Sequence, residues 1–166
     1  VWTTLHSNDA ITIPFRLRDL KVENYKLGDP SLLTGLISQR LVCVLCPYCS
    51  RPVVDEMELP QSMRARLDEA SVPIDTLRLH NRAGCHKCGE GNGYRGRTVV
   101  AEVILPDENF MNYVKEDNRA AAENYWLNHL GGRTMMEHAI DRLMAGELDP
   151  FDAEKVVGPV VRPKRH

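Results

Sequence analysis

Four cysteines in two matched pairs are the residues of this sequence best suited to chemistry. Two residues separate Cys46 from Cys49, and two separate Cys85 from Cys88. Such spacing lets one tight turn aim both sulfurs at a single point, and two turns supply the four thiolates that Zn²⁺ prefers at about 2.3 Å. Four protein ligands leave no open coordination position. The spacing therefore predicts a closed structural zinc site and not a catalytic metal.

Two other interpretations of these cysteines stay open on spacing alone: a disulfide framework, or a dithiol redox centre at one pair. About 35 residues separate the pairs, more than the 15–20 of a simple zinc ribbon, so the intervening segment is expected to carry its own secondary structure. His86 lies inside the second pair and could replace a cysteine as ligand. Cys43 belongs to an apolar run, which predicts a buried small side chain.

Three common catalytic motifs are absent from the sequence. It contains no G-x-x-x-x-G-K-[ST] phosphate loop, no apolar strand ending in paired acids and no assignable serine–histidine–acid order. A glycine-rich stretch after the second cysteine pair lacks Lys-Ser/Thr and predicts turns; it contains Gly89, Gly91, Gly93 and Gly96. On residue chemistry alone, the chain is not expected to be a self-sufficient enzyme.

Hydrophobic spacing predicts the elements that precede the cysteines. Residues Val1 to Leu5 are typical of a strand, and Asp9 after it can cap a helix in which Pro14 either lies near the first turn or causes a kink. Asp29-Pro30 predicts the start of a second helix. Its apolar residues at helical spacing are Leu32, Leu33, Leu36, Ile37 and Leu41. A short apolar run, 42–45, then leads into the first cysteine pair.

The second half of the chain has clearer signals. We expect a short helix over 61–70, a strand around Leu77 to Leu79, and a stronger strand over 98–105 that Pro106 ends. The remainder is expected to be helical, over 108–115, 119–130, 134–145 and 151–157. Thr134 with Glu137 matches a capping box, and Gly146 is a natural helix end. The methionine-rich stripe of the third of these helices is interpreted as core.

Composition places the chain among folded proteins and gives no argument for nucleic acid or an anionic membrane as partner. Its 166 residues suit one domain, or one small domain plus part of another, with 43% hydrophobic and 27% charged residues and a net charge of −2. The basic tail (Arg162, Lys164, Arg165) is expected to be a solvated end. No apolar run approaches the roughly 20 residues that span a bilayer, so a cytosolic location is expected. Val1 opens the sequence without Met, which suggests further sequence upstream.

Several segments also follow one another in a particular order. They are Thr4–Ala10 (TLHSNDA), Arg16-Leu17, Leu36–Val42 with Cys46–Cys49, Gly84–Cys88, Gly93–Thr98 with Glu102, and the closing helices from Thr134. In this order they resemble the histidine box, the helix arginine and the two cysteine segments of the C-terminal half of the type II secretion and type IV pilus assembly ATPase family. The resemblance covers nearly the whole chain.

That resemblance implies an α/β fold: the remnant of a RecA-like P-loop ATPase core, with a tetracysteine zinc-knuckle insertion and a helical C-terminal subdomain. The expected boundaries are 1–45 for the core part, 46–97 for the zinc segment, 98–158 for a core strand plus the helical subdomain, and 159–166 for the tail. The phosphate loop and the metal-binding acids of such a protein would precede Val1.

The resemblance likewise implies a function for the intact protein. It would be a homo-hexamer at the cytoplasmic face of the bacterial inner membrane, would use ATP and Mg²⁺, and would act with an inner-membrane platform protein to assemble a pilus or pseudopilus. His6 would be the sensor that reaches toward the γ-phosphate, although residue chemistry alone leaves a satisfied strand-end histidine as the alternative. Arg16, Arg40 and Arg97 would meet nucleotide or a neighbouring subunit, the alternative being surface or packing arginines.

A competing hypothesis is a stand-alone zinc-ribbon module that binds protein or nucleic acid. The sequence lacks the basic patch and the aromatic platform expected of nucleic-acid binders, which leaves protein partners for that hypothesis. A dithiol oxidoreductase is the third possibility, and it would need a reactive cysteine of low pKa.

Overall fold

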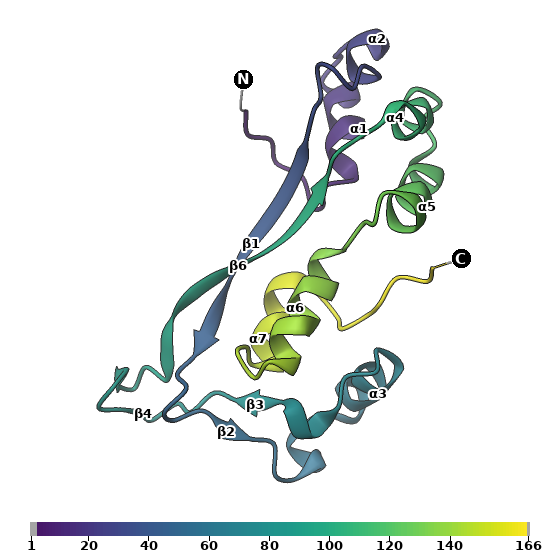
Figure 1. Cartoon of the computed structure of the whole chain (residues 1–166). Coiled ribbons are helices and arrows are strands. Elements are labelled where there is room, and N and C mark those ends of the chain that lie inside the picture. Colours follow the sequence, from purple (N-terminus) through teal and green to yellow (C-terminus); the bar gives the residue numbers. More distant parts are fainter. Residues whose placement is uncertain (1–2, 166) are drawn as a thin grey trace. The chain divides into compact units, whose positions relative to one another are not determined.

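The structure, a computed structural model, describes residues 3–165 and contains two compact units (Figure 1). Unit 1 comprises the residues up to Gln39, Ala101–Thr134 and the chain from Lys164 on; unit 2 comprises Arg40–Val100 and Met135–Pro163. Each unit is therefore discontinuous in sequence. The long strands β1 (Leu36–Leu45) and β6 (Tyr94–Ile104) pair with each other, and each passes from one unit into the other.

Strand β1 occupies part of the segment for which the sequence predicted a helix, and that prediction was wrong. Burial alternates along the strand, with Leu36 and Ser38 buried and Ile37 exposed between them. This two-residue period is that of a strand, in which successive side chains point to opposite faces. Asp29 does not cap a helix: its carboxylate accepts a hydrogen bond from the Ser31 N–H (2.8 Å) in a local turn.

The helices in the described part of unit 1 are α1 (Thr12–Asp19), α2 (Asn24–Leu27), α4 (Glu108–Lys115) and α5 (Arg119–His129). Helix α4 packs against α5 and α2, and α2 packs against α1. The core between α4, α5 and the strands β1 and β6 also includes the residues just before α1 and consists of Ala10, Ile11, Leu36, Ile104, Phe110, Met111, Val114, Ala122, Trp126 and Leu127. The carboxylate of Asp107 caps α4 by accepting from the Phe110 N–H at 2.8 Å, which fixes the turn that follows β6.

Unit 2 surrounds a second core. Its elements are β2 (Arg51–Pro52), η1 (Glu56–Glu58), α3 (Gln61–Glu69), η2 (Ile74–Thr76), β3 (Arg78–Leu79), β4 (Gly84–Cys85), β5 (Gly89–Glu90), α6 (Met135–Met144) and α7 (Pro150–Val157). Leu67, Leu77 and Ile140 are fully buried in this core. The Arg66 guanidinium of α3 donates to both carboxylate oxygens of Glu154 on α7, at 2.8 and 2.7 Å, a two-pronged geometry that joins the two helices.

Most of the other predicted elements are confirmed. Helices α3 to α7 and strand β3 lie where hydrophobic spacing placed them, and β6 begins at Tyr94, four residues before its predicted start. Helix α6 ends at Met144, two residues before Gly146, whose φ is +67°. Met135, Met136 and the rest of the buried α6 stripe belong to the core of unit 2, as expected. The predicted N-terminal strand lies partly outside the described residues (Val1 and Trp2), and residues 3–5 form no strand.

The basic residues of the C-terminal tail, Arg162, Lys164 and Arg165, are exposed as expected, but the tail is also held against the rest of the chain. Val160 is buried in the core of unit 2. The Arg162 guanidinium donates to the Ala70 carbonyl at 2.7 Å, and that of Arg165 donates to the Leu127 carbonyl at 2.6 Å. Arginine side chains thus satisfy carbonyl groups at the ends of helices, where orphan acceptors are available. Within residues 3–165, no helix has both the length and the hydropathy needed to cross a bilayer.

Truncation of Phe110 tests the core of unit 1. Because its side chain is fully buried, Phe110→Ala is expected to lower the free energy of unfolding by about 3–5 kcal/mol. Leu105→Ala serves as the control, since Leu105 is 72% exposed and should cost less than about 0.5 kcal/mol. Urea unfolding followed by tryptophan fluorescence measures both, and equal losses in the two variants would contradict the packing described.

Candidate functional site

The first cysteine pair lies in a turn directly after β1. The Cys46 N–H donates to the Gly93 carbonyl at 2.9 Å, and the Ser50 N–H donates to the Cys46 carbonyl at 2.9 Å. The first bond joins the end of β1 to the residue before β6, and the second closes the Cys-Pro-Tyr-Cys turn. Both are backbone bonds, so they hold the turn whatever occupies the space between the sulfurs.

The second pair lies in a small hairpin, in which β4 and β5 run antiparallel with Cys85 opposite Gly89. The Cys88 N–H donates to the Cys85 carbonyl at 3.1 Å, which turns the chain between the two sulfurs. Gly84 precedes the turn with φ +69°, and a Cβ there would lie 2.2 Å from the Gly89 carbonyl oxygen. Only glycine fits this position, both for its φ and for the close approach of the backbone.

The four sulfurs converge. All lie within 4.8 Å of one another, with Cys46 buried and the other three half-buried. The Cys46–Cys85, Cys49–Cys88 and Cys85–Cys88 Sγ···Sγ distances are 3.9, 3.8 and 3.8 Å. A disulfide would need about 2.05 Å, whereas a tetrahedron of sulfurs around a metal at about 2.3 Å has edges of about 3.8 Å. The arrangement is that of a metal site, and all five cysteines are free thiols, which contradicts the disulfide interpretation.

Electrostatics explain why these sulfurs need a cation. Hydrogen bonds from the backbone of Lys87 and Cys88 lower the pKa of Cys85 to about 6, whereas burial and the neighbouring thiols raise the pKa of Cys49 to about 12. Burial, and after it the neighbouring thiols, thus oppose a thiolate at Cys49 while no metal is bound. A divalent metal reverses that penalty and deprotonates its cysteine ligands.

A layer of side chains joins the cysteine turns to α7. The His80 ring stacks on Tyr94 with centroids 4.0 Å apart, and the Tyr94 hydroxyl donates to Asp152 at 2.7 Å. The backbone N–H of His80 donates to the Asp149 carboxylate at 2.7 Å, and the same carboxylate caps α7. Burial raises the pKa of Asp149, and burial together with Asp152 raises that of Tyr94. Sequence spacing did not predict this layer, because its members come from three separate segments: His80, Tyr94, and the start of α7 with Asp149 and Asp152.

Cys43 and His86 lie near the cysteine turns but do not belong to the set of four converging ligands. Cys43, expected to be buried, is half-buried and lines an open groove beside Cys88. His86 is exposed and is not among the four converging ligands, so the structure does not favour its replacing a cysteine.

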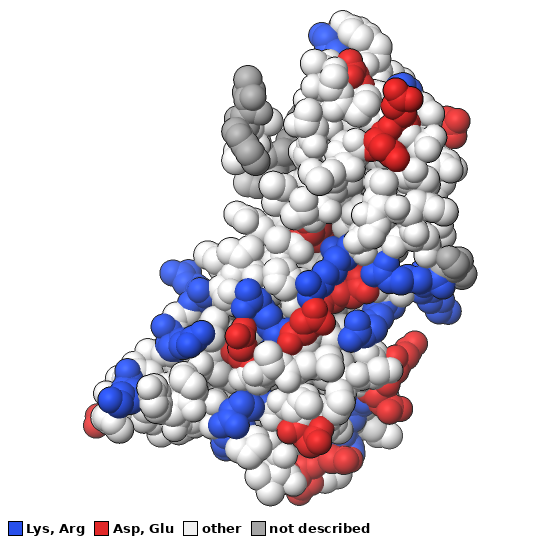
Figure 2. All heavy atoms as spheres, in the orientation of Figure 1, with Lys and Arg blue, Asp and Glu red and all other residues white. Residues whose placement is uncertain are grey.

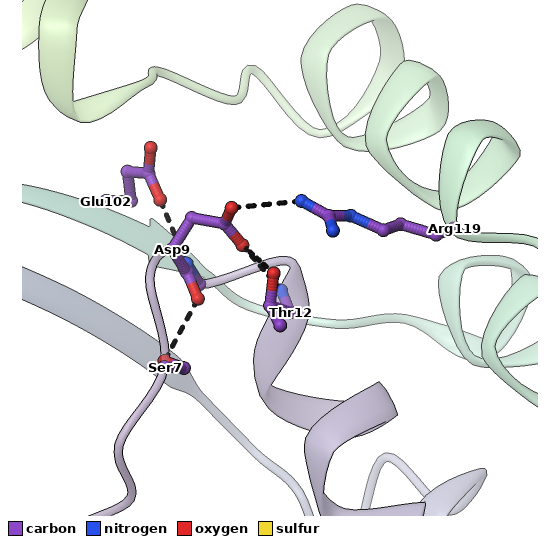
Figure 3. A network of polar contacts seen from close by, with 6 residues as sticks. Ser7, Asp9, Thr12, Glu102 and Arg119 are labelled. Atoms are coloured by element: carbon purple, nitrogen blue, oxygen red, sulfur yellow. Dashed lines mark hydrogen bonds and ion pairs between the residues drawn. The ribbon is translucent and has the colours of Figure 1, made fainter. Parts of the chain in front are cut away.

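The segment around His6 is held by a polar network in unit 1 (Figure 3). The Asp9 carboxylate accepts from the N–H of Thr12, the first residue of α1, at 2.7 Å and from the Arg119 guanidinium of α5 at 3.0 Å, although the N-cap position itself is Ile11. The Ala10 N–H donates to the Glu102 carboxylate of β6 at 2.9 Å. His6 itself is exposed. The network therefore fixes the backbone that follows the histidine while leaving its side chain accessible.

The three predicted arginines occupy different surroundings. Arg16 is exposed on α1 and pairs with Asp19 at 3.5 Å, and a guanidinium nitrogen of Arg40 donates to the Val156 carbonyl of α7. Arg97 is exposed and lines the groove that contains Cys43. His6 and Arg16 belong to unit 1, whereas Arg40, Arg97 and the four cysteines belong to unit 2.

Comparison with known families connects these features. The model of the family described as "Type II/IV secretion system protein" matches residues 1–156. The chain belongs to this family. The resemblance first suggested by the ordered segments is thereby confirmed over most of the sequence.

Several curated relatives of this chain have names that describe them as ATPases. The chain is 32% identical over 148 residues to the type II secretion system ATPase E of Vibrio cholerae, covering 88% of this chain and 27% of that protein. It is 30% identical over 146 residues to the type IV pilus assembly ATPase PilB of Thermus thermophilus, covering 88% and 16%. It is also 30% identical over 163 residues to PilB of Myxococcus xanthus, covering 95% and 26%. The chain thus spans at most about a quarter of the length of these three relatives.

Metal content provides the first test of the cysteine site. Purified chain is expected to carry one divalent metal, and Cys85→Ser should bind it at least about 100-fold more weakly, because a direct ligand matters at least as much as the outer partners whose loss costs about 10–100-fold. Cys43→Ser is the matched control and should keep the metal, since its sulfur is outside the set. Elemental analysis with chelator competition measures both, and equal loss in the two variants would refute the assignment.

The network around Asp9 yields a second prediction. Glu102→Gln replaces a charge-assisted hydrogen bond to the Ala10 N–H by a neutral one, which is roughly half as strong. Exchange of the Ala10 amide with solvent, followed by NMR, should accelerate several-fold, corresponding to about 1 kcal/mol. Glu108→Gln, an exposed acid on α4, should leave that amide unchanged. An Ala10 amide insensitive to Glu102→Gln would show that the contact does not hold the segment.

Proposed function

We propose that this chain is the C-terminal part of a hexameric ATPase that powers the assembly of a type IV pilus or of a type II secretion pseudopilus. The intact protein would have a RecA-like P-loop core whose phosphate loop lies upstream of Val1. It would work at the cytoplasmic face of the bacterial inner membrane together with a platform protein in that membrane.

The family match over residues 1–156 is the observation that carries this proposal. The converging cysteines support it independently of the match, since the ordered segments include both cysteine pairs and the structure brings all four sulfurs together. Zn²⁺ is the metal proposed for them, because four thiolates in a closed tetrahedral set are its usual structural ligands. Its role would be to hold the two turns against each other.

His6 is proposed to respond to the terminal phosphate of bound ATP. Its imidazole is exposed, and the segment just after it is held by Asp9 and by the Ala10–Glu102 hydrogen bond. Because the backbone is fixed, the side chain can make or lose one hydrogen bond to a phosphate oxygen while the position of the chain stays the same. ATP and Mg²⁺, held by upstream residues in this proposal, would supply the phosphoryl group and its charge neutralisation.

Arg16, Arg40 and Arg97 are proposed contacts to nucleotide or to a neighbouring subunit. Exposure on the described surface supports Arg16 and Arg97 for such a role, since a guanidinium must reach another molecule to serve it. Arg40 already donates to the Val156 carbonyl, so its guanidinium is the most constrained of the three. Loss of Arg40 is accordingly expected to affect packing of α7 as well.

The decisive experiment uses the intact protein encoded by the natural gene. Magnesium-dependent ATP hydrolysis is expected for it, and His6→Ala should lower kcat about 100-fold, the usual effect of removing one group that stabilises transition-state charge. KM should change little if His6 acts on the phosphate during reaction and not in binding. His129→Ala is the matched control, because His129 is an exposed histidine in the same unit.

Three results would count against this proposal. An intact protein without ATP turnover would overturn the ATPase function and bring forward a stand-alone zinc-binding module with protein partners. A His6→Ala enzyme with normal kcat would remove only the role of His6. Magnesium-dependent turnover by the 166-residue chain alone would contradict the placement of the phosphate loop outside it.

A further inference from the structure

An open groove of about 590 Å³ lies beside the cysteine site in unit 2. Its lining comes from the β4–β5 hairpin and from the two long strands: Cys43, Lys87, Cys88, Asn92, Tyr94, Arg95, Gly96 and Arg97. On the face drawn in Figure 2, Lys and Arg side chains gather over the hairpin and the first part of β6. Three of the eight lining residues are cations and none is an acid, which sets the groove apart from a generic surface depression.

The two arginines reach the groove from the same strand. Arg95 and Arg97 are two residues apart on β6, so their side chains leave the same face of the strand. Gly96 between them has φ +149°, and a Cβ placed on it would meet no atom within 4 Å. The backbone between the guanidiniums is therefore open to a ligand.

These cations are not neutralised by acids of the described chain. Among residues 3–165, Lys87, Arg95 and Arg97 make no ion pair, although Lys87 lies 5.8 Å from the Tyr48 ring centroid. Arg95 and Arg97 also line an adjoining hollow, and the acid of that hollow, Glu147, pairs with Arg142 at 2.7 Å. Three like charges gathered without a counter-charge repel one another, and a bound anion removes that repulsion.

We propose that this groove, the basic groove, binds a chain of two or three linked phosphate groups. Each guanidinium can grip phosphate oxygens with two parallel N–H donors, and the Lys87 ammonium adds a mobile point charge. A single carboxylate carries one negative charge and cannot match three cations, whereas a diphosphate or triphosphate carries enough. The phosphate chain could be that of a nucleotide or of inorganic polyphosphate.

This inference refines the role proposed above for Arg97. It rests on the proposed ATPase function only where it names a nucleotide as one possible source of the phosphate chain. Arg95 and Lys87 are new in it, since spacing alone gave no reason to place the hairpin lysine beside the strand arginines. Turnover is not required of the basic groove. Phosphate binding and ATPase activity can therefore fail separately.

Calorimetric titration of the zinc-loaded chain with tripolyphosphate at low salt tests the proposal. One site per chain is expected, and Arg95→Gln/Arg97→Gln should weaken it at least tenfold. The matched control removes two exposed charges outside the basic groove, Arg82→Gln/Lys155→Gln, and should stay within about twofold. Absence of saturable binding, or an equal loss in both double variants, would overturn the assignment.

Two further ligands identify the chemistry and its source. Citrate, which offers carboxylates in place of phosphates, should bind at least tenfold more weakly, and equal affinity would refute a phosphate site. ATP binding more tightly than tripolyphosphate would assign the source as a nucleotide, and equal affinity would assign the phosphate chain alone; both support the basic groove. Because these titrations use the chain itself, an intact protein without ATPase activity would leave their outcome unchanged.

Discussion

Convergence of four cysteine sulfurs is the constraint on which the organisation of unit 2 depends. The two pairs bracket β2, α3 and β3, and the segment between them supplies much of the core around Leu67 and Leu77. Backbone bonds such as Cys46 N–H to Gly93 place the turns, but the sulfurs would repel as thiolates without a cation. Bringing the two cysteine pairs together closes the loop between them and so costs conformational entropy. A metal that binds only the folded state would offset that cost.

The same turns determine what surrounds them. Tyr94 and His80 stack beside the site and reach the acids at the start of α7, so the position of the hairpin and that of the helix are coupled through hydrogen bonds. Lys87 lies within the hairpin, between Cys85 and Cys88. Its proximity to Arg95 and Arg97 is thus a consequence of the cysteine geometry, which links a structural site to the charge of the surface next to it.

Prediction from sequence succeeded where a signal was local. The cysteine spacing and the amphipathic C-terminal helices are encoded within a few residues each, and β6 has a dense run of β-branched side chains. The segment before the cysteines failed because its apolar residues fit a helical period, while the burial of Ser38 on the inner face of β1 could not be foreseen. Contacts between residues far apart in the sequence, such as Arg119 with Asp9, could not be predicted from residue spacing, because only the folded chain brings them together.

Because β1 and β6 each contribute to both units, neither unit can be separated from the other by a simple truncation. Unit 1 uses three separate stretches of chain and unit 2 uses two, so no single cut, by a protease or at the level of the gene, releases either one whole. Removal of the first 39 residues would strip unit 1 of α1 and α2 and leave α4 and α5 without part of their core. Expression of unit 2 alone would require a new junction between Val100 and Met135, in effect a deletion that cuts β6 short of its end and joins it to the start of α6.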